Sequence, residues 1–155
     1  MGTAPAKRLS EKGYDENKLG FGDIFTDHML MIRYSVAEGG WQAPEIKPFQ
    51  NIEMHPAGMV LHYGQQVFEG LKAFADPDGD GIFLFRPDMN IARFNRSCVR
   101  LCIPTIDPKL FMDQMTELIR KDRDWIPRKA GTSLYIRPTV IATDPHLGVR
   151  PSKTY

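Results

Sequence analysis

An arginine interrupts an otherwise apolar run of branched and aromatic residues in the stretch GTSLYIRPTVIATDPHLGV, at residues 131–149. Because side chains alternate along a strand, Tyr135 and Arg137 share one face and lie roughly 6–7 Å apart. A guanidinium supplies charge and a phenol supplies a further donor, so this pair can hold a small carboxylate. The alternative is an exposed sheet face on which Arg137 extends its head group into water.

Three more arginines occupy one side of a helix that we expect at residues 87–102, opened by its proline. Arg93, Arg96 and Arg100 are three and four residues apart, so they share a face. Like charges this close repel one another unless an anion compensates, and guanidinium groups suit phosphate or carboxylate. A solvated basic face is the alternative reading.

Patterns that suggest a metal site are incomplete. Asp76, Asp78, Asp80 and Gly81 match the first half of a calcium-binding loop, but the position of the final glutamate is Pro87 and the flanks read as strands. The four histidines show no zinc-site spacing. We therefore expect a solvated hairpin turn and no metal.

The elements that must position these groups indicate an α+β fold, because helices and strands do not strictly alternate. Alternate residues of a strand at 133–142 form a core-facing side: Leu134, Ile136, Val140 and Ala142. The other expected elements are a strand at 23–35, a loop at 42–58, a helix at 59–69 closed by Gly70, hairpin strands at 71–75 and 81–86, and a helix at 107–122 capped by Asp107. Cys98 and Cys102 should share a buried helix face.

Composition limits the function classes. The chain has 155 residues, of which 42% are hydrophobic and 25% charged, as in a single globular domain. A net charge of +1 provides no field for nucleic acid or an anionic membrane. No apolar run approaches the ~20 residues of a membrane span, and the polar lead-in at residues 1–20 lacks a signal-peptide core. We expect a cytoplasmic protein.

Three blocks in order carry a family resemblance: LHYGQQVFEGLKAF at 61–74, LFRPDMNIARFNRS at 84–97 and SLYIRPTVIATDPHLGV at 133–149. Together they resemble branched-chain amino-acid aminotransferases, pyridoxal 5'-phosphate enzymes of fold type IV, the D-amino-acid-aminotransferase-like fold. The resemblance implies a small α/β domain at residues 21–143, with a mostly antiparallel sheet flanked by helices, and the start of an interdomain connection at 144–155.

The same resemblance implies roles for particular residues. Arg96 matches the arginine that binds the cofactor phosphate, and Tyr135 and Arg137 match the pair near the substrate carboxylate. Tyr63 matches a tyrosine of the substrate pocket, and Phe21 an aromatic wall against the branched side chain. Leu147 and Val149 match a loop that closes the neighbouring subunit's pocket in the family's homodimer.

The family's Schiff-base lysine belongs to a large catalytic domain that has no counterpart in this sequence. The resemblance therefore implies a truncated domain with no catalytic residue of its own, inactive alone and not expected to bind the cofactor by itself. Its intact relatives would transfer the amino group of leucine, isoleucine or valine to 2-oxoglutarate. The alternatives are the small domain of a D-amino-acid aminotransferase or aminodeoxychorismate lyase, and a non-catalytic interaction module.

Overall fold

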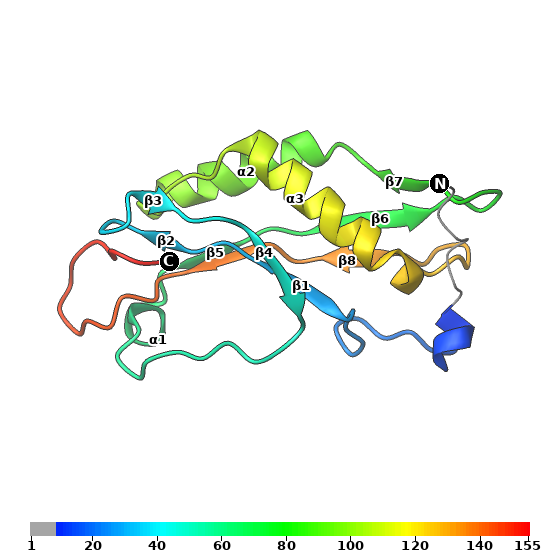
Figure 1. The fold of residues 1–155 in the computed structure, drawn as a ribbon, viewed down its shortest axis with the longest axis horizontal. Helices are drawn as coiled ribbons and strands as arrows, with labels where there is room; N and C mark the ends of the chain where they lie inside the picture. Colours follow the sequence, from blue (N-terminus) through cyan, green and yellow to red (C-terminus); the bar gives the residue numbers. More distant parts are fainter. Residues whose placement is uncertain (1–8) are drawn as a thin grey trace.

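The computed structural model describes residues 9–155 and places two long helices over one face of a set of antiparallel strands (Figure 1). The strands are β1 (His28–Met31), β2 (Tyr34–Ser35), β3 (Gly40–Trp41), β4 (Glu45–Pro48), β5 (Gln66–Phe68), β6 (Leu71–Ala75), β7 (Ile82–Leu84), β8 (Leu134–Ile136) and β9 (Thr139–Ile141). The helices are α1 (Met59–Tyr63), α2 (Pro87–Arg100) and α3 (Pro108–Lys121), with 3-10 turns at Leu9–Lys12 and Arg123–Trp125. The predicted α+β class with antiparallel sheets is confirmed.

A long two-stranded ladder carries the residues of interest. β5 pairs with β9 and β6 pairs with β8, and both pairings keep one antiparallel register. The ladder is interrupted between them, where Glu69 N–H donates to the carbonyl of Pro138 at 2.9 Å. Proline has no N–H to return that bond, so the strand expected at 133–142 divides into β8 and β9.

The core lies between this ladder and the helices. The helices contribute Ile91, Phe94, Cys98, Phe111, Met115 and Ile119, and the strands contribute Val67, Leu71, Ala73 and Val140. The N-terminus of α3 is capped as predicted, since Asp107 Oδ1 accepts the N–H of Leu110 at 2.7 Å. Cys102 is exposed because α2 ends at Arg100, so the expectation that both cysteines are buried was wrong for Cys102.

The predicted helix at 59–69 was also wrong in length. Gly64 adopts φ +61 and its N–H bonds to the carbonyl of Val60, which ends α1 after one turn. The chain then extends into β5, so its side chains alternate instead of forming a helical stripe. As a result Phe68 is 63% exposed although Val67 is buried.

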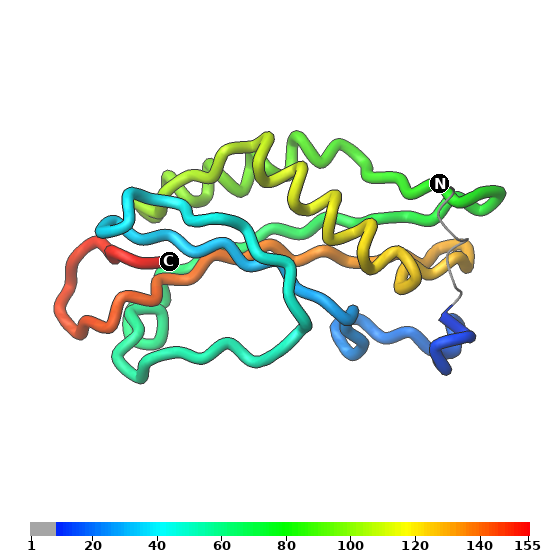
Figure 2. Tube along the Cα trace, in the orientation of Figure 1, coloured from blue at the N-terminus to red at the C-terminus, as the bar shows by residue number. Residues whose placement is uncertain are grey.

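Two other strand assignments differ from the sequence-based expectation. The strand expected at 23–35 is two short ones, β1 and β2, and the expected loop at 42–58 contains β4, which pairs with β1. The C-terminal end folds back beside β2, where Tyr34 and Tyr155 exchange backbone hydrogen bonds (Figure 2). These pairings join segments distant in sequence, which local patterns do not reveal.

Residues 9–20 of the polar lead-in pack against the rest of the domain. Residues 1–8 lie outside the described part of the chain. Leu9 is buried, and the ring of Tyr14 lies 5.4 Å from that of Trp125. Glu16 Oε2 accepts the backbone N–H groups of Arg128 and Lys129 at 3.0 and 2.8 Å. This segment therefore packs against the connection between α3 and β8.

The acidic turn between β6 and β7 is a hairpin, as the sequence predicted. Asp76 Oδ1 accepts the N–H of Asp78 within it, and Arg128 donates to the carbonyl of Gly79 at 2.7 Å. Over residues 9–155, no group of three or more potential ligand side chains is arranged to hold a metal ion. Nor does that part of the chain contain a helix long and apolar enough to cross a membrane.

Candidate functional site

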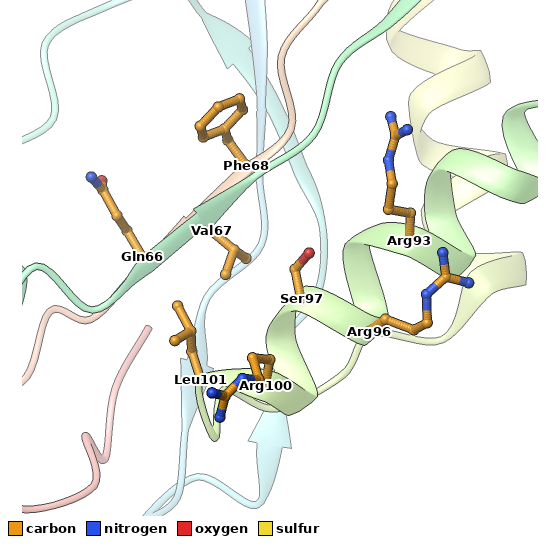
Figure 3. Close-up of a pocket in the computed structure, with 8 residues that line it drawn as sticks. All are labelled: Gln66, Val67, Phe68, Arg93, Arg96, Ser97, Arg100 and Leu101. Atoms are coloured by element: carbon orange, nitrogen blue, oxygen red, sulfur yellow. The ribbon is translucent and has the colours of Figure 1, made fainter.

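Two adjoining open hollows lie between β5 and α2, with volumes of about 480 and 460 Å³. Figure 3 shows the first, where Ser97 of α2 lies opposite Val67 of β5 and the side chain of Arg96 extends away from the strand. Its lining comprises Gln66, Val67, Phe68, Arg93, Arg96, Ser97, Arg100 and Leu101. The second is lined by Phe68, Glu69, Gly70, Arg93, Ser97 and Tyr135. Arg93 thus borders both hollows, whereas Arg96 borders only the first.

Tyr135 and Arg137 stand together, as the strand periodicity predicted. Arg137 donates to the phenol oxygen from Nη2 at 2.9 Å and from Nε at 3.2 Å. Because Arg137 is the donor, the phenol hydrogen remains free to donate elsewhere. Within residues 9–155, no carboxylate forms an ion pair with Arg137, so its remaining donors are open to a ligand.

Aromatic rings surround this pair. The guanidinium carbon of Arg137 lies 4.4 Å from the centroid of the Phe68 ring, a cation–π contact. Phe21 packs edge-on against Tyr135 with the ring centroids 4.8 Å apart, and is itself 73% exposed. The arrangement therefore combines cationic donors with apolar walls.

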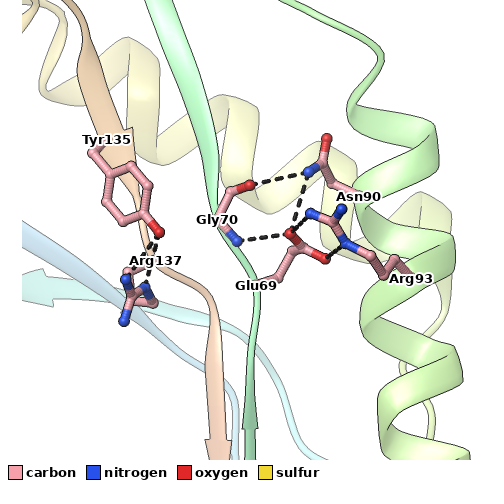
Figure 4. Close-up of polar contacts among 6 residues, drawn as sticks. All are labelled: Glu69, Gly70, Asn90, Arg93, Tyr135 and Arg137. Carbon is pink, nitrogen blue, oxygen red and sulfur yellow. Dashed lines mark hydrogen bonds and ion pairs between the residues drawn. The ribbon is translucent and has the colours of Figure 1, made fainter.

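A second polar cluster joins α2 to residues 69 and 70, where the ladder is interrupted between β5 and β6 (Figure 4). Arg93 Nε donates to Glu69 Oε2 at 2.7 Å, and Arg93 Nη2 donates to Glu69 Oε1. Glu69 also accepts the N–H of Gly70 at 2.8 Å and a hydrogen from Asn90 at 3.3 Å. The buried carboxylate of Glu69 is thus hydrogen-bonded both to the backbone at Gly70 and to the α2 side chains Asn90 and Arg93.

The Arg93 guanidinium lowers the pKa of Glu69 from its ordinary 4.5 to about 2, with the Gly70 and Asn90 donors contributing, although burial opposes this shift. A depressed carboxyl pKa stabilises the fold fully above about pH 4.5. This contribution is lost as the pH falls through about 2. Glu69 is therefore ionised at any pH near neutrality.

The sequence did not predict that three residues, Phe68, Glu69 and Arg93, would lie together at the hollows. Phe68 fell within the helix expected at 59–69, and Arg93 was not distinguished from Arg96 and Arg100. One signal was present: Glu69 is a charged residue inside the apolar run VFEGL, and such a residue is rarely buried without a partner.

The remaining predicted residues form a separate group. The phenol of Tyr63 donates to the backbone carbonyl of Leu147, and Met59 N–H donates to the carbonyl of Asp144 at 3.1 Å. The loop that follows β9 is thereby held to α1, with Leu147 and Val149 61% and 89% exposed. Tyr63 lines neither hollow.

These groups suit a ligand with two anionic ends. Arginine side chains of α2 border one part of the hollows and Tyr135 borders another, while Arg137 is hydrogen-bonded to the Tyr135 phenol without lining either hollow. No lysine is among the residues that line either hollow. The lining can therefore bind and orient a phosphate and a carboxylate, but it offers no amine at that place for a covalent bond to a carbonyl.

Relatives of known sequence share about half of the residues. Branched-chain-amino-acid aminotransferase 2 of Bacillus subtilis is 53% identical over 141 residues, which is 91% of this chain and 38% of that protein. The cytosolic enzyme of Mus musculus is 49% identical over 150 residues, 96% of this chain and 38% of that protein. The chain thus spans about two fifths of the length of these relatives. No family model matches it.

Solved structures agree with this similarity. A branched-chain amino acid aminotransferase from Escherichia coli superposes with a TM-score of 0.58 and 27% identity, over 71% of this chain and 34% of that one. The T.th. enzyme complexed with N-(5'-phosphopyridoxyl)-L-glutamate gives 0.57 at 24% identity, over 81% and 39%, and so supports the fold alone. By sequence and fold together, this chain belongs to the branched-chain-amino-acid aminotransferase family, fold type IV.

Proposed function

We propose that this chain is the substrate-recognising small domain of a branched-chain aminotransferase, which transfers the amino group of leucine, isoleucine or valine to 2-oxoglutarate. The observation that carries the proposal is the Tyr135–Arg137 pair beside the Phe68 ring: Tyr135 and Phe68 line the second hollow, and Arg137 is hydrogen-bonded to the Tyr135 phenol. Such a pair holds the carboxylate that every substrate of this reaction carries, while the aromatic walls accept a branched apolar side chain. In this reading residues 21–143 form the domain and 144–155 begin a connection.

The cofactor of the proposed activity is pyridoxal 5'-phosphate. The exposed arginines of α2 fit its phosphate, and the solved T.th. relative holds a phosphopyridoxyl compound. When bound, the cofactor supplies an aldehyde and an electron-withdrawing ring that stabilises negative charge on the substrate carbon. The chain's own residues would bind the two anionic ends; no lysine lines the hollows, so we expect this chain to be inactive alone.

Further parts of the proposal concern assembly and location. Phe21 and Tyr63 would wall the substrate pocket, and the exposed Leu147 and Val149 would close the pocket of a second subunit in a homodimer. Their exposure supports this, since an apolar pair that reaches 61% and 89% exposure suits a contact outside the chain. A cytoplasmic location is also part of the proposal, supported by the cytosolic mouse relative.

A chimera tests the proposed function. This chain replaces the matching stretch of the Bacillus subtilis aminotransferase 2, and the formation of glutamate from leucine and 2-oxoglutarate is measured. We expect kcat/KM within about tenfold of the parent, a loss of ~1.4 kcal/mol of transition-state stabilisation or less. A folded chimera without turnover would contradict the proposal, and a preference for D-amino acids would favour the alternative fold-type IV activity.

Separate replacement of Arg93 and Arg96 in this chimera identifies the phosphate ligand. We expect Arg93→Ala to weaken pyridoxal 5'-phosphate at least about tenfold, because charge-assisted hydrogen bonds are roughly twice as strong as neutral ones. Arg93 borders both hollows and has a fixed orientation, so its effect should exceed that of Arg96→Ala, the residue that the family resemblance selected. Cofactor affinity is measured by equilibrium dialysis, and a larger effect at Arg96 would restore the original assignment.

A further inference from the structure

We propose that Glu69 is a positioning residue that fixes the guanidinium of Arg93 for anion binding at the two hollows. The inference rests on the proposed function only for the identity of the natural anion, a cofactor phosphate. The site itself is defined by residues of this chain and can be tested with inorganic phosphate.

Glu69 orients the guanidinium of Arg93 but occupies only some of its hydrogen-bond donors. Its guanidinium carries five N–H donors, and the carboxylate of Glu69 takes one from Nε and one from Nη2. Three donors remain, and the side chain of Arg93 is 59% exposed where it borders the hollows. The guanidinium is thus restrained on one edge and free on the other, the arrangement that suits planar binding of a phosphate.

Glu69 is anchored more firmly than its partner. Its side chain is 5% exposed and also accepts hydrogens from Gly70 N–H and Asn90 Nδ2. Asn90 Nδ2 in turn donates to the carbonyl of Gly70 at 3.1 Å. The carboxylate is therefore buried and hydrogen-bonded where the ladder is interrupted, and it restrains Arg93, a residue of α2 that borders both hollows.

The same network also connects Arg93 to the Tyr135–Arg137 pair. Gly70, which Glu69 holds through its N–H, lies directly beneath the phenol of Tyr135. Residues 69 and 70 therefore contact Arg93 on one side and Tyr135 on the other. These contacts would set the spacing between the two anionic ends of a bound ligand.

Coulomb's law and positioning predict effects of opposite sign when the charge of Glu69 is removed. As a charge alone, Glu69 repels phosphate and competes for Arg93, so Glu69→Gln should tighten phosphate binding. As a positioning residue, its removal frees Arg93 to sample other rotamers, and the cost of ordering that side chain weakens binding by about two- to tenfold. The sign of the change therefore separates the two roles.

The test titrates inorganic phosphate into the full chain, labelled with ¹⁵N, and follows the Arg93 Nε–H signal by NMR. We expect weak binding by the unmodified chain and about fivefold weaker binding by Glu69→Gln, from the loss of side-chain ordering. Arg93→Lys, which keeps the charge but not the planar fork, should weaken binding similarly. Asp88→Asn is the matched control: it removes one carboxylate from α2 without touching Arg93, and should leave binding equal or slightly tighter.

Circular dichroism checks that each variant is folded, and glutamine is used at position 69 because it preserves the shape of the glutamate side chain. Equal or tighter phosphate binding by Glu69→Gln overturns the inference, as do undiminished binding by Arg93→Lys and the absence of binding by the unmodified chain. An inactive chimera together with weaker phosphate binding by Glu69→Gln would reject the proposed function and keep the inference. An active chimera together with unchanged phosphate binding by Glu69→Gln would support the proposed function and reject the inference.

Discussion

Replacing Arg137 by alanine should lower kcat/KM of the chimera for leucine and for 2-oxoglutarate by roughly a hundredfold, because two charge-assisted contacts of about 1.5 kcal/mol each would be lost. Under the proposed function the substrate carboxylate would lose the charge that faces it, and Tyr135 would lose the two donors that orient its phenol. Both substrates carry this carboxylate, so both half-reactions should suffer. Steady-state kinetics with each substrate varied in turn measures the effect.

Two further variants show whether the loss reflects geometry. Arg137→Lys keeps the positive charge but cannot reproduce both bonds to Tyr135 or the planar contact with Phe68, so it should recover only a small part of the activity. Arg120→Ala removes an arginine from the exposed side of α3 and should leave kinetics unchanged. Unchanged kinetic constants for both substrates in Arg137→Ala would remove the carboxylate role.

Gly70→Ala should impair both the fold and the site. A Cβ at Gly70 would lie 3.0 Å from Cζ of Tyr135 and closer still to its phenol oxygen. The Gly70 backbone is not in the left-handed region, so the effect is steric and not conformational. We expect the free energy of unfolding to fall by about 1–3 kcal/mol, as in other overpacked sites, measured by urea denaturation.

The displaced phenol should also leave the second hollow and release Arg137. In the chimera we therefore expect Gly70→Ala to lower kcat/KM about tenfold or more, since a small misplacement of a binding group is costly. The double variant with Tyr135→Phe removes the atom that the new Cβ meets first. It should regain part of the lost stability without regaining activity; a fully stable and active Gly70→Ala would show that the phenol does not need this space.

Strand periodicity was sufficient to predict that Tyr135 and Arg137 lie together, because residues two apart share a face wherever the backbone is extended. The break at Pro138 does not disturb this, since the ladder keeps its register on both sides. Helix capping by Asp107 and the hairpin at 76–81 were also predictable, because each depends on residues close in sequence.

The Glu69–Arg93 pair was not predictable in the same way. Its residues are 24 positions apart, and they meet only because α2 packs beside the point where the ladder is interrupted. The error at residues 59–69 had a local cause: Gly64 can end a helix after one turn, but hydrophobic spacing favours continuing it. Because of that error, the exposed Phe68 ring that lies beside the Arg137 guanidinium was not foreseen.

The central claim is that this chain recognises two anionic groups while the covalent chemistry is carried by other residues. Treating the chain with pyridoxal 5'-phosphate, reducing with borohydride and mapping the labelled lysines by mass spectrometry tests this directly. We predict scattered labelling, with no lysine approaching one label per chain. Stoichiometric labelling of a single lysine, above all Lys72, which pairs with Tyr135 in the ladder, would contradict it.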